Sequence, residues 1–218
     1  MTIPILYEDD DILAVSKPEA LAAIPERHGP GGSLYEALCA ERGERLYIVH
    51  RIDKETSGLI VFARSAEAHR RLNRQFETRE VEKTYLALVH GVITEDAISV
   101  DAPLRQFGSG RVAVDPARGK PSATEFRVLD RFGSHTLVEA RPRTGRRHQI
   151  RVHLYHLGHP IAGDPLYGGE ATRRGFARMM LHAWRLELTL PSGRLLAIEA
   201  PIPESFEAAL DTLRRASG

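Results

Sequence analysis

The sequence has very little cysteine and lacks a long hydrophobic run. Its single cysteine, Cys39, excludes an internal disulfide and any zinc site built from cysteines. Its longest apolar stretches, such as residues 59–63, fall far short of the about 20 residues that span a bilayer, and residues 1–4 lead into acidic residues rather than the basic segment of a signal peptide. We therefore expect a cytoplasmic protein with no membrane partner.

An excess of charge of one sign is also missing, because 30 lysines and arginines face 29 aspartates and glutamates and leave a net charge of +1. Composition alone therefore does not indicate a nucleic-acid partner. The distribution is uneven, however, since residues 140–163 contain no acidic residue. The same segment carries five arginines, Arg141, Arg143, Arg146, Arg147 and Arg151. Such a block predicts a local anion-binding site.

The patterning predicts many strands and few helices. The 218 residues, 42% of them apolar, show no repeat or long linker, so we expect one domain over residues 1–218. Ser33 and Ser65 are predicted to cap two helices, and Pro203 is predicted to begin the last one. Strand-like patterns occur at residues 12–16, 58–63, 84–89, 123–129 and 136–141, with a hairpin at 184–190 and 195–200. Because strands and helices do not alternate strictly, we expect an α+β fold with a mixed, mostly antiparallel sheet flanked by helices.

A first polar cluster precedes the predicted strand at residues 58–63. If residues 50–53 are extended, Arg51 and Asp53 project from one face and His50 and Ile52 from the other. A carboxylate at the start of a rigid, buried strand is well placed to act as a nucleophile or a base. The alternative is a surface ion pair with turn hydroxyls, since charge clusters are often only structural.

A second cluster lies in the arginine-rich segment. Thr144 is predicted to cap a helix that runs to Leu157, and the backbone N–H groups at its start, together with the arginines, favour a bound phosphate. Arg147 and Arg151, four residues apart, would then act on the same ligand. The alternative is a solvated basic helix face, which five arginines without a neighbouring acid make less favourable.

Histidines at 148, 153, 156 and 159 raise the question of a metal site. His153 and His156 would share a helix face, but no carboxylate or cysteine is near them in the sequence. Sets made only of histidine, without a recognisable spacing, are weak evidence for metal binding. We therefore expect no metal.

Four motifs, taken in order along the chain, resemble the RNA pseudouridine synthases of the RluA type. They are HRID at 50–53 with TSG at 56–58, KTYLALVHG at 83–91, RTGR at 143–146 continuing to residue 153, and GHPI at 158–161 with YG at 167–168. Residues 6–9 and the Lys-Pro pair at 17–18 fit as well. Ala20 departs from the family, where glycine is common, and Ile52 stands where leucine is usual. Because the motifs begin almost at the first residue, we expect no N-terminal S4 RNA-binding module.

The resemblance implies a pseudouridine synthase fold and an isomerase that detaches uracil from ribose at N1, turns it and rejoins it through C5. Asp53 would act on the ribose, either by adding to C1′ or by taking the 2′ proton. Arg151 would favour the ionised form of Asp53, and Tyr85 would stack on the target base and is placed to move a proton. The reaction needs no redox change or group donor, so no cofactor is expected.

The resemblance also implies an RNA partner. Arg51 would fill the space that the flipped base leaves, and the candidates for phosphate contacts are Arg143, Arg146, Arg147 and His148. Ribosomal RNA, transfer RNA or both remain open as substrates, because the discriminating contacts are expected in the loops at 23–32 and 107–121, which carry no readable code. A monomer is expected.

Two other classes stay open. A glycosidase would also use carboxylates at an anomeric carbon, with Asp53 and Glu55 as the pair. A pure RNA-binding module would keep the arginines and have no need of Asp53.

Overall fold

The computed structural model describes residues 2–25 and 32–217, and of Ser217 only the backbone. The chain divides into two compact units. Unit 1 comprises Met1–Lys83 and Ala183–Pro201, and unit 2 comprises Thr84–His182 and Ile202–Gly218. The expectation of one domain over residues 1–218 stays a prediction. Most of the loop predicted at 23–32 lies outside the described residues.

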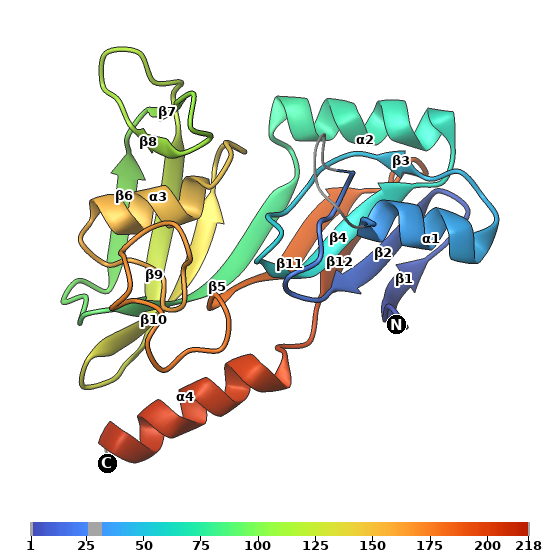
Figure 1. Cartoon of the computed structure of the whole chain (residues 1–218). Helices are drawn as coiled ribbons and strands as arrows, with labels where there is room; N and C mark the ends of the chain where they lie inside the picture. Colours follow the sequence, from blue (N-terminus) through green and yellow to red (C-terminus); the bar gives the residue numbers. More distant parts are fainter. Residues whose placement is uncertain (1, 26–31, 218) are drawn as a thin grey trace. The chain divides into compact units, whose positions relative to one another are not determined.

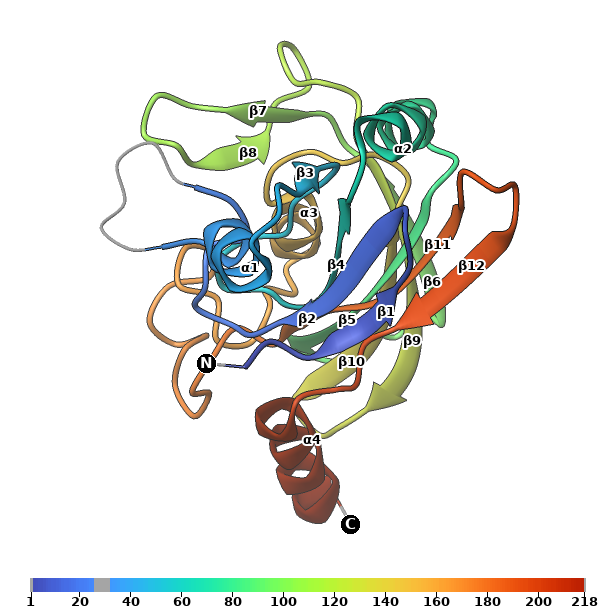
Figure 2. The same cartoon turned by 90° about the vertical axis from the view of Figure 1, so that its right-hand side faces the viewer.

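Unit 1 is built on strands that pair in the order β1-β2-β4-β11, with β3 added to β4 and β12 added to β11 (Figure 1). The strands are β1 (Ile5–Glu8), β2 (Ile12–Lys17), β3 (Tyr47–Ile48), β4 (Ser57–Ala63), β11 (Leu181–Thr189) and β12 (Leu195–Glu199). The pairs β1 with β2, β2 with β4, β3 with β4 and β11 with β12 are antiparallel. Figure 2 shows β12 running beside β1, which it contacts.

The two helices of unit 1 begin where the sequence predicts. Ser33 accepts the Glu36 N–H before α1 (Leu34–Arg42), while the Glu36 carboxylate accepts the Ser33 N–H to complete a capping box. Ser65 accepts the Ala68 N–H before α2 (Ala66–Thr78). The predicted hairpin is confirmed as β11 and β12.

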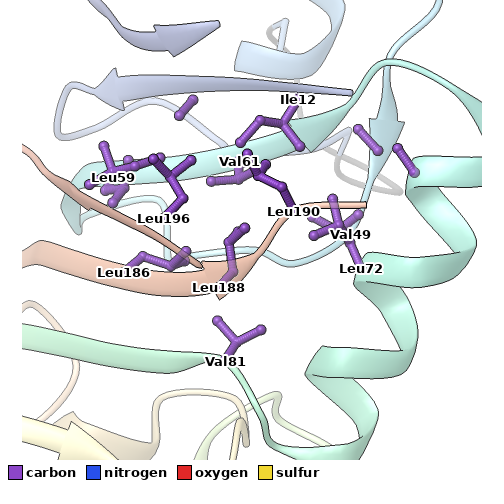
Figure 3. Close-up of a cluster of buried hydrophobic side chains, with 14 of the residues drawn as sticks. Ile12, Val49, Leu59, Val61, Leu72, Val81, Leu186, Leu188, Leu190 and Leu196 are labelled. Carbon is purple, nitrogen blue, oxygen red and sulfur yellow. The ribbon is translucent and has the colours of Figure 1, made fainter. Parts of the chain in front are cut away.

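The core of unit 1 lies between its strands and α2 (Figure 3). Every residue of β4 is buried. Val61 and Leu59 of β4 meet Leu72 of α2 and Leu186 and Leu188 of β11 in one apolar cluster. Because close packing of this kind resists deformation, β4 is a rigid support for the residues that precede it.

Unit 2 carries strands in the order β5-β10-β9-β6, and all three pairings are antiparallel. The elements are β5 (Glu82–His90), β6 (Ala97–Asp101), β9 (Ala123–Arg131), β10 (His135–Pro142), the small hairpin β7 (Leu104–Gln106) and β8 (Val112–Val114), α3 (Gln149–His156) and α4 (Glu204–Ser217). Helix α3 contacts β8, β9 and β10 (Figure 1). Helix α4 follows Pro203 and buries Phe206 and Leu210, as predicted.

The predicted start of the arginine-rich helix is wrong. Helix α3 begins at Gln149, five residues after Thr144, and no side chain caps it. His148 adopts a left-handed conformation (φ 54°) that interrupts a helix at this point. The Thr144 hydroxyl instead donates to the Gln149 side chain (2.6 Å) and accepts the Ala123 N–H (3.2 Å). Thr144 therefore does not lie at a helix start, so the expected phosphate site cannot use the N–H groups of a helix terminus there.

The expected fold class is confirmed. Antiparallel strands predominate in both units, and the helices α1 to α4 of the described residues flank them. Within the described part of the chain, no helix combines the length and apolar character needed to cross a membrane.

Candidate active site

Asp53 begins a tight turn at the entrance to β4. Its backbone carbonyl accepts the Thr56 N–H at 3.1 Å, and Asp53 itself is partly exposed. Thr56 and Ser57, which lead from the turn into β4, are buried. Gly58 then permits a close approach between strands, because a Cβ at this position would lie 2.2 Å from the Ala183 carbonyl oxygen. The carboxylate is thus carried by a short turn fixed to a rigid strand.

The residues before Asp53 differ in exposure. Ile52 is buried and His50 is partly buried, whereas Arg51 is exposed. The His50 Nε2 accepts the Val61 N–H at 3.0 Å, and its ring stacks on Phe76 with centroids 4.7 Å apart. Burial, and secondarily the positive charge of Lys83, lower the pKa of His50 to about 3. A neutral His50 is therefore a hydrogen-bond acceptor that anchors the segment to β4.

A buried lysine holds the other side of the same turn. Lys17 is 1% exposed, and its ammonium donates to the carbonyl oxygens of Pro18 (2.7 Å), Leu21 (2.8 Å) and Lys54 (3.0 Å). Three charge-assisted bonds compensate the loss of water around the ammonium. One of them reaches the residue directly after Asp53, so Lys17 fixes the backbone of the turn.

Ala20 lies in the loop that Lys17 holds. Its φ of 61° falls in the left-handed region, which glycine adopts readily and alanine only at an energetic cost. The departure noted in the sequence therefore coincides with backbone strain, of the order of 1 kcal/mol.

In unit 2, Arg151 forms a buried ion pair with Asp164. The Arg151 Nε donates to Asp164 Oδ2 (2.8 Å) and Nη2 donates to Oδ1 (2.7 Å), with both side chains 0% exposed. The guanidinium also lies over the Tyr167 ring, 5.1 Å from its centroid. Such a planar, two-point contact fixes the orientation of an arginine. Asp164 was missed in the sequence because it lies 13 residues from Arg151, although it belongs to the segment between the two parts of the fourth motif.

Tyr167 connects three segments of unit 2. Its hydroxyl accepts the Val112 N–H of β8 (3.1 Å) and lies 2.9 Å from His148 Nδ1. His148 is 8% exposed, which leaves it the least accessible of the five residues predicted to contact RNA. Its position beside Tyr167 links the loop before α3 to the β7–β8 hairpin.

Acids from outside the arginine-rich segment neutralise much of it. The expectation of five arginines without an acid is wrong, because the segment folds against carboxylates that the sequence window excludes. The pairs are Arg141 with Glu139, Arg143 with Glu125 and Arg151 with Asp164. The ion pair of Arg143 with Glu125 is bidentate, with Nε 2.9 Å from Oε1 and Nη2 2.7 Å from Oε2. Both side chains are half exposed, so the contribution of the pair to stability is small.

Arg146 and Arg147 differ from these three, because neither makes an ion pair with any residue that the structure describes. Arg147 is exposed and precedes α3, while Arg151 lies within the helix and is buried. Arg147 therefore lies outside the helix that carries Arg151, and the expectation that the two act on the same ligand loses the helical spacing on which it rested. Arg146 and Arg147 are the arginines of the loop most available to an anionic ligand.

Gln149 fixes the loop that carries these arginines. Its side-chain oxygen accepts the Thr144 hydroxyl (2.6 Å) and the Arg146 N–H (3.0 Å). Its amide nitrogen donates to the Ala123 carbonyl (2.9 Å) and to the Thr124 hydroxyl (3.0 Å). A buried amide with both ends satisfied ties the loop to β9.

His153 of α3 has structural partners on both ring nitrogens. His153 is buried between the Thr124 hydroxyl (2.8 Å) and the Ala102 carbonyl (3.0 Å), and burial lowers its pKa. Among the described residues, no group of three or more histidine, cysteine or acidic side chains is arranged to hold a metal ion.

Tyr85 lies on β5, opposite Ala140 of β10, and is partly buried. Tyr85 and Arg151 thus belong to unit 2, and Arg51 and Asp53 to unit 1.

Comparison with known proteins identifies the family. Residues 11–156, which include all three predicted catalytic residues, match the family model described as RNA pseudouridylate synthase. The chain belongs to this family of RNA-modifying isomerases. The resemblance of the four motifs is thereby confirmed, and with it the predicted enzyme class.

Relatives of the pseudouridine synthase family match nearly the whole chain. It is 41% identical to a ribosomal large subunit pseudouridine synthase D of Nitrosomonas europaea over 97% of its own length and 65% of that protein. It is also 41% identical to the protein of the same name from Pseudomonas aeruginosa, over 98% of the chain and 72% of the relative. Among solved structures, human RNA pseudouridylate synthase domain containing 1 matches with a TM-score of 0.83 and 30% identity, covering 99% of this chain and 94% of that one. The pseudouridine synthase fold is confirmed.

Proposed function

We propose that this protein converts uridine to pseudouridine in ribosomal RNA of the large subunit. The observation that carries the proposal is the family match over residues 11–156, which contains Asp53, Tyr85 and Arg151. The names of the relatives from Nitrosomonas and Pseudomonas support ribosomal RNA as the substrate. Transfer RNA is a second substrate to be measured in the same experiment.

In the proposed reaction, Asp53 is the carboxylate that acts on the ribose. It either adds to C1′ or takes the 2′ proton, and in both routes the bond from C1′ to N1 of uracil breaks. The base turns and C5 bonds to C1′, which displaces the Asp53 carboxylate from C1′ in the first route and is accompanied by return of the proton from Asp53 to C2′ in the second. The proton lost from C5 is balanced by the proton gained at N1. The turn at the entrance to β4, held by Lys17 and His50, supports this role, because catalysis requires a carboxylate in a fixed position.

Tyr85 and Arg151 complete the proposed catalytic set. In this proposal, Arg151 supplies the cation that pairs with the Asp53 carboxylate. Tyr85 offers an aromatic face for the detached base and a hydroxyl for proton transfer. The reaction requires no cofactor.

The proposed RNA contacts are of two kinds. Arg51 is exposed two residues from Asp53 and would occupy the space left by the flipped base. The phosphate contacts are made by the loop before α3, chiefly by Arg146 and Arg147. Arg143 contributes a contact only when its ion pair with Glu125 breaks and the guanidinium binds phosphate instead. His148 is retained as a contact at the buried end of this loop.

Position-resolved mapping of pseudouridine tests the function. In a strain lacking the gene, wild-type protein should restore pseudouridine at defined uridines of large-subunit RNA, whereas Asp53→Ala should restore none and still bind that RNA. Glu55→Gln is the matched control, because Glu55 lies two residues from Asp53 and takes no part in the proposed reaction. Full modification by Asp53→Ala would contradict the proposal.

The same assay separates the two alternatives. Loss of modification in Glu55→Gln together with release of free uracil would indicate a glycosidase. RNA binding without any modification by the wild-type protein would indicate a binding module. Tyr85→Phe keeps the aromatic face, so it should retain RNA binding and turn over more slowly if the hydroxyl moves a proton.

A further inference from the structure

Asp164 occupies a position that the family match does not cover, since that match ends at residue 156. Its carboxylate is buried in unit 2 and grips Arg151 through two hydrogen bonds, from Nε to Oδ2 (2.8 Å) and from Nη2 to Oδ1 (2.7 Å). A guanidinium has five N–H groups. These two bonds engage the Nε and Nη2 groups of Arg151.

The carboxylate of Asp164 is itself immobilised. Its Oδ1 also accepts the backbone N–H groups of Leu166 (2.8 Å) and Tyr167 (3.1 Å). The preceding Gly163 has φ 77°, and a Cβ there would lie 1.8 Å from the Arg178 carbonyl oxygen. The turn that carries Asp164 is therefore restricted to one backbone conformation, and the fold fixes the position of the Asp164 carboxylate.

The charge of Asp164 matters as much as its position. A buried guanidinium without a counter-charge is strongly unfavourable, whereas a paired one keeps its charge in a dry environment. Asp164 is too enclosed to reach a ribose itself, because it is fully buried and both of its oxygens are bonded. Its effect on any reaction must therefore pass through Arg151.

We propose that Asp164 is a positioning residue for the reaction, which holds the Arg151 guanidinium in the one orientation that the proposed catalytic role of Arg151 requires. This inference rests on the proposed function, in which Arg151 supports Asp53. The ring of Tyr167 beneath the guanidinium (5.1 Å) restricts its tilt. Asp164 thus extends the catalytic set beyond the residues that the motifs indicate.

The test is Asp164→Asn, which keeps the shape of the side chain but replaces one acceptor by an amide that opposes the Arg151 Nε–H. Steady-state kinetics on the large-subunit RNA fragment that the wild type modifies should show kcat reduced by about 100-fold, the loss expected for a catalytic group displaced by about 1 Å, with KM for RNA little changed. The Arg151 Nε–H resonance should be protected from exchange in the wild type, where Asp164 accepts it, and should become exchangeable in the variant.

Glu139→Gln is the matched control. Glu139 is also a buried carboxylate of unit 2 (4% exposed) and pairs with Arg127 and Arg141. Its register partner is Leu86, so it lies on the opposite face of the strands from Tyr85. This control should lose thermal stability as Asp164→Asn does, but keep wild-type kcat.

A folded Asp164→Asn variant with wild-type kcat and a protected Arg151 Nε–H would overturn the inference. If that variant does not fold, Asp164→Glu takes its place, because it keeps the charge and moves the carboxylate by one methylene. A reduced kcat of Asp164→Glu would support the inference, and a wild-type kcat would overturn it. Failure of the proposed function is distinguishable, because the wild-type protein itself would then make no pseudouridine.

Discussion

His50 makes the stability of unit 1 sensitive to acid. Its pKa is about 3 in the folded protein, because burial disfavours the imidazolium, against about 6.5 for an ordinary histidine. The unfolded chain therefore takes up a proton first as the pH falls, and folded stability is complete above pH 6.5 and declines towards pH 3. Between pH 7 and pH 5, this single group should lower the free energy of unfolding by about 2 kcal/mol.

The measurement is urea unfolding at pH 7 and pH 5, followed by the fluorescence of Trp184, the only tryptophan, which lies in unit 1. His50→Gln keeps a hydrogen-bond acceptor without a titrating ring, so it should lose about 1 kcal/mol at pH 7 from the missing stack on Phe76 and show about 2 kcal/mol less acid sensitivity than the wild type. His156→Gln is the control, because His156 lies at an exposed position of α3. Its free energy of unfolding should differ between pH 7 and pH 5 by as much as that of the wild type. If the free energy of unfolding decreased equally from pH 7 to pH 5 in the wild type and in His50→Gln, the reasoning would be refuted.

Two further predictions concern strain and RNA binding. Ala20→Gly should raise the midpoint of thermal unfolding by about 2–4 °C, since glycine relieves the φ of 61° at a smaller entropic cost; an unchanged or lower midpoint would show that the loop is not strained. Arg147→Ala should reduce the slope of log affinity against log salt by about 0.7 on single-stranded RNA, as one lost phosphate contact does, whereas Arg143→Ala should have a smaller effect because Arg143 must first leave Glu125. Equal slopes for the wild type and Arg147→Ala, measured by filter binding, would exclude a phosphate contact.

Local signals explain why much of the fold was predictable. Ser33 and Ser65 each cap a helix through a hydrogen bond to a residue three positions later, so the sequence contains both partners. Residues 58–63 are apolar without a break because both faces of β4 are buried. Where the partners are close in sequence or the periodicity is simple, prediction and structure agree.

The helix boundary at Gln149 shows the limit of that approach. Thr144 is a good capping residue, and nothing in the local pattern excludes a helix beginning there. In the fold, however, its hydroxyl bonds to Gln149 and to Ala123 of β9, which lies 21 residues away. A tertiary contact thus removes Thr144 from the capping role, and the left-handed His148 sets the start of α3.

The missed acids have a related cause. The segment without acidic residues, 140–163, is bounded by Glu139 on one side and Asp164 on the other, and both neutralise arginines within it. Glu139 reaches Arg141 along the same strand, and Asp164 reaches Arg151 because a turn at Gly163 brings the chain back to α3. A count of charges within a window cannot register acids at its edges.

Buried charges support the proposed catalytic side chains in both units. In unit 1, Lys17 holds the turn after Asp53 through the Lys54 carbonyl, and in unit 2, Asp164 holds Arg151. Burying a charge is costly unless several hydrogen bonds satisfy it. These hydrogen bonds hold the charged group and its partners in place to within a fraction of an ångström. Catalysis depends on that precision more than stability does, since an apolar substitute could fill the same space. Variants of Lys17, which holds the turn after Asp53, and of Asp164, which pairs with Arg151, should therefore impair turnover while leaving RNA binding intact.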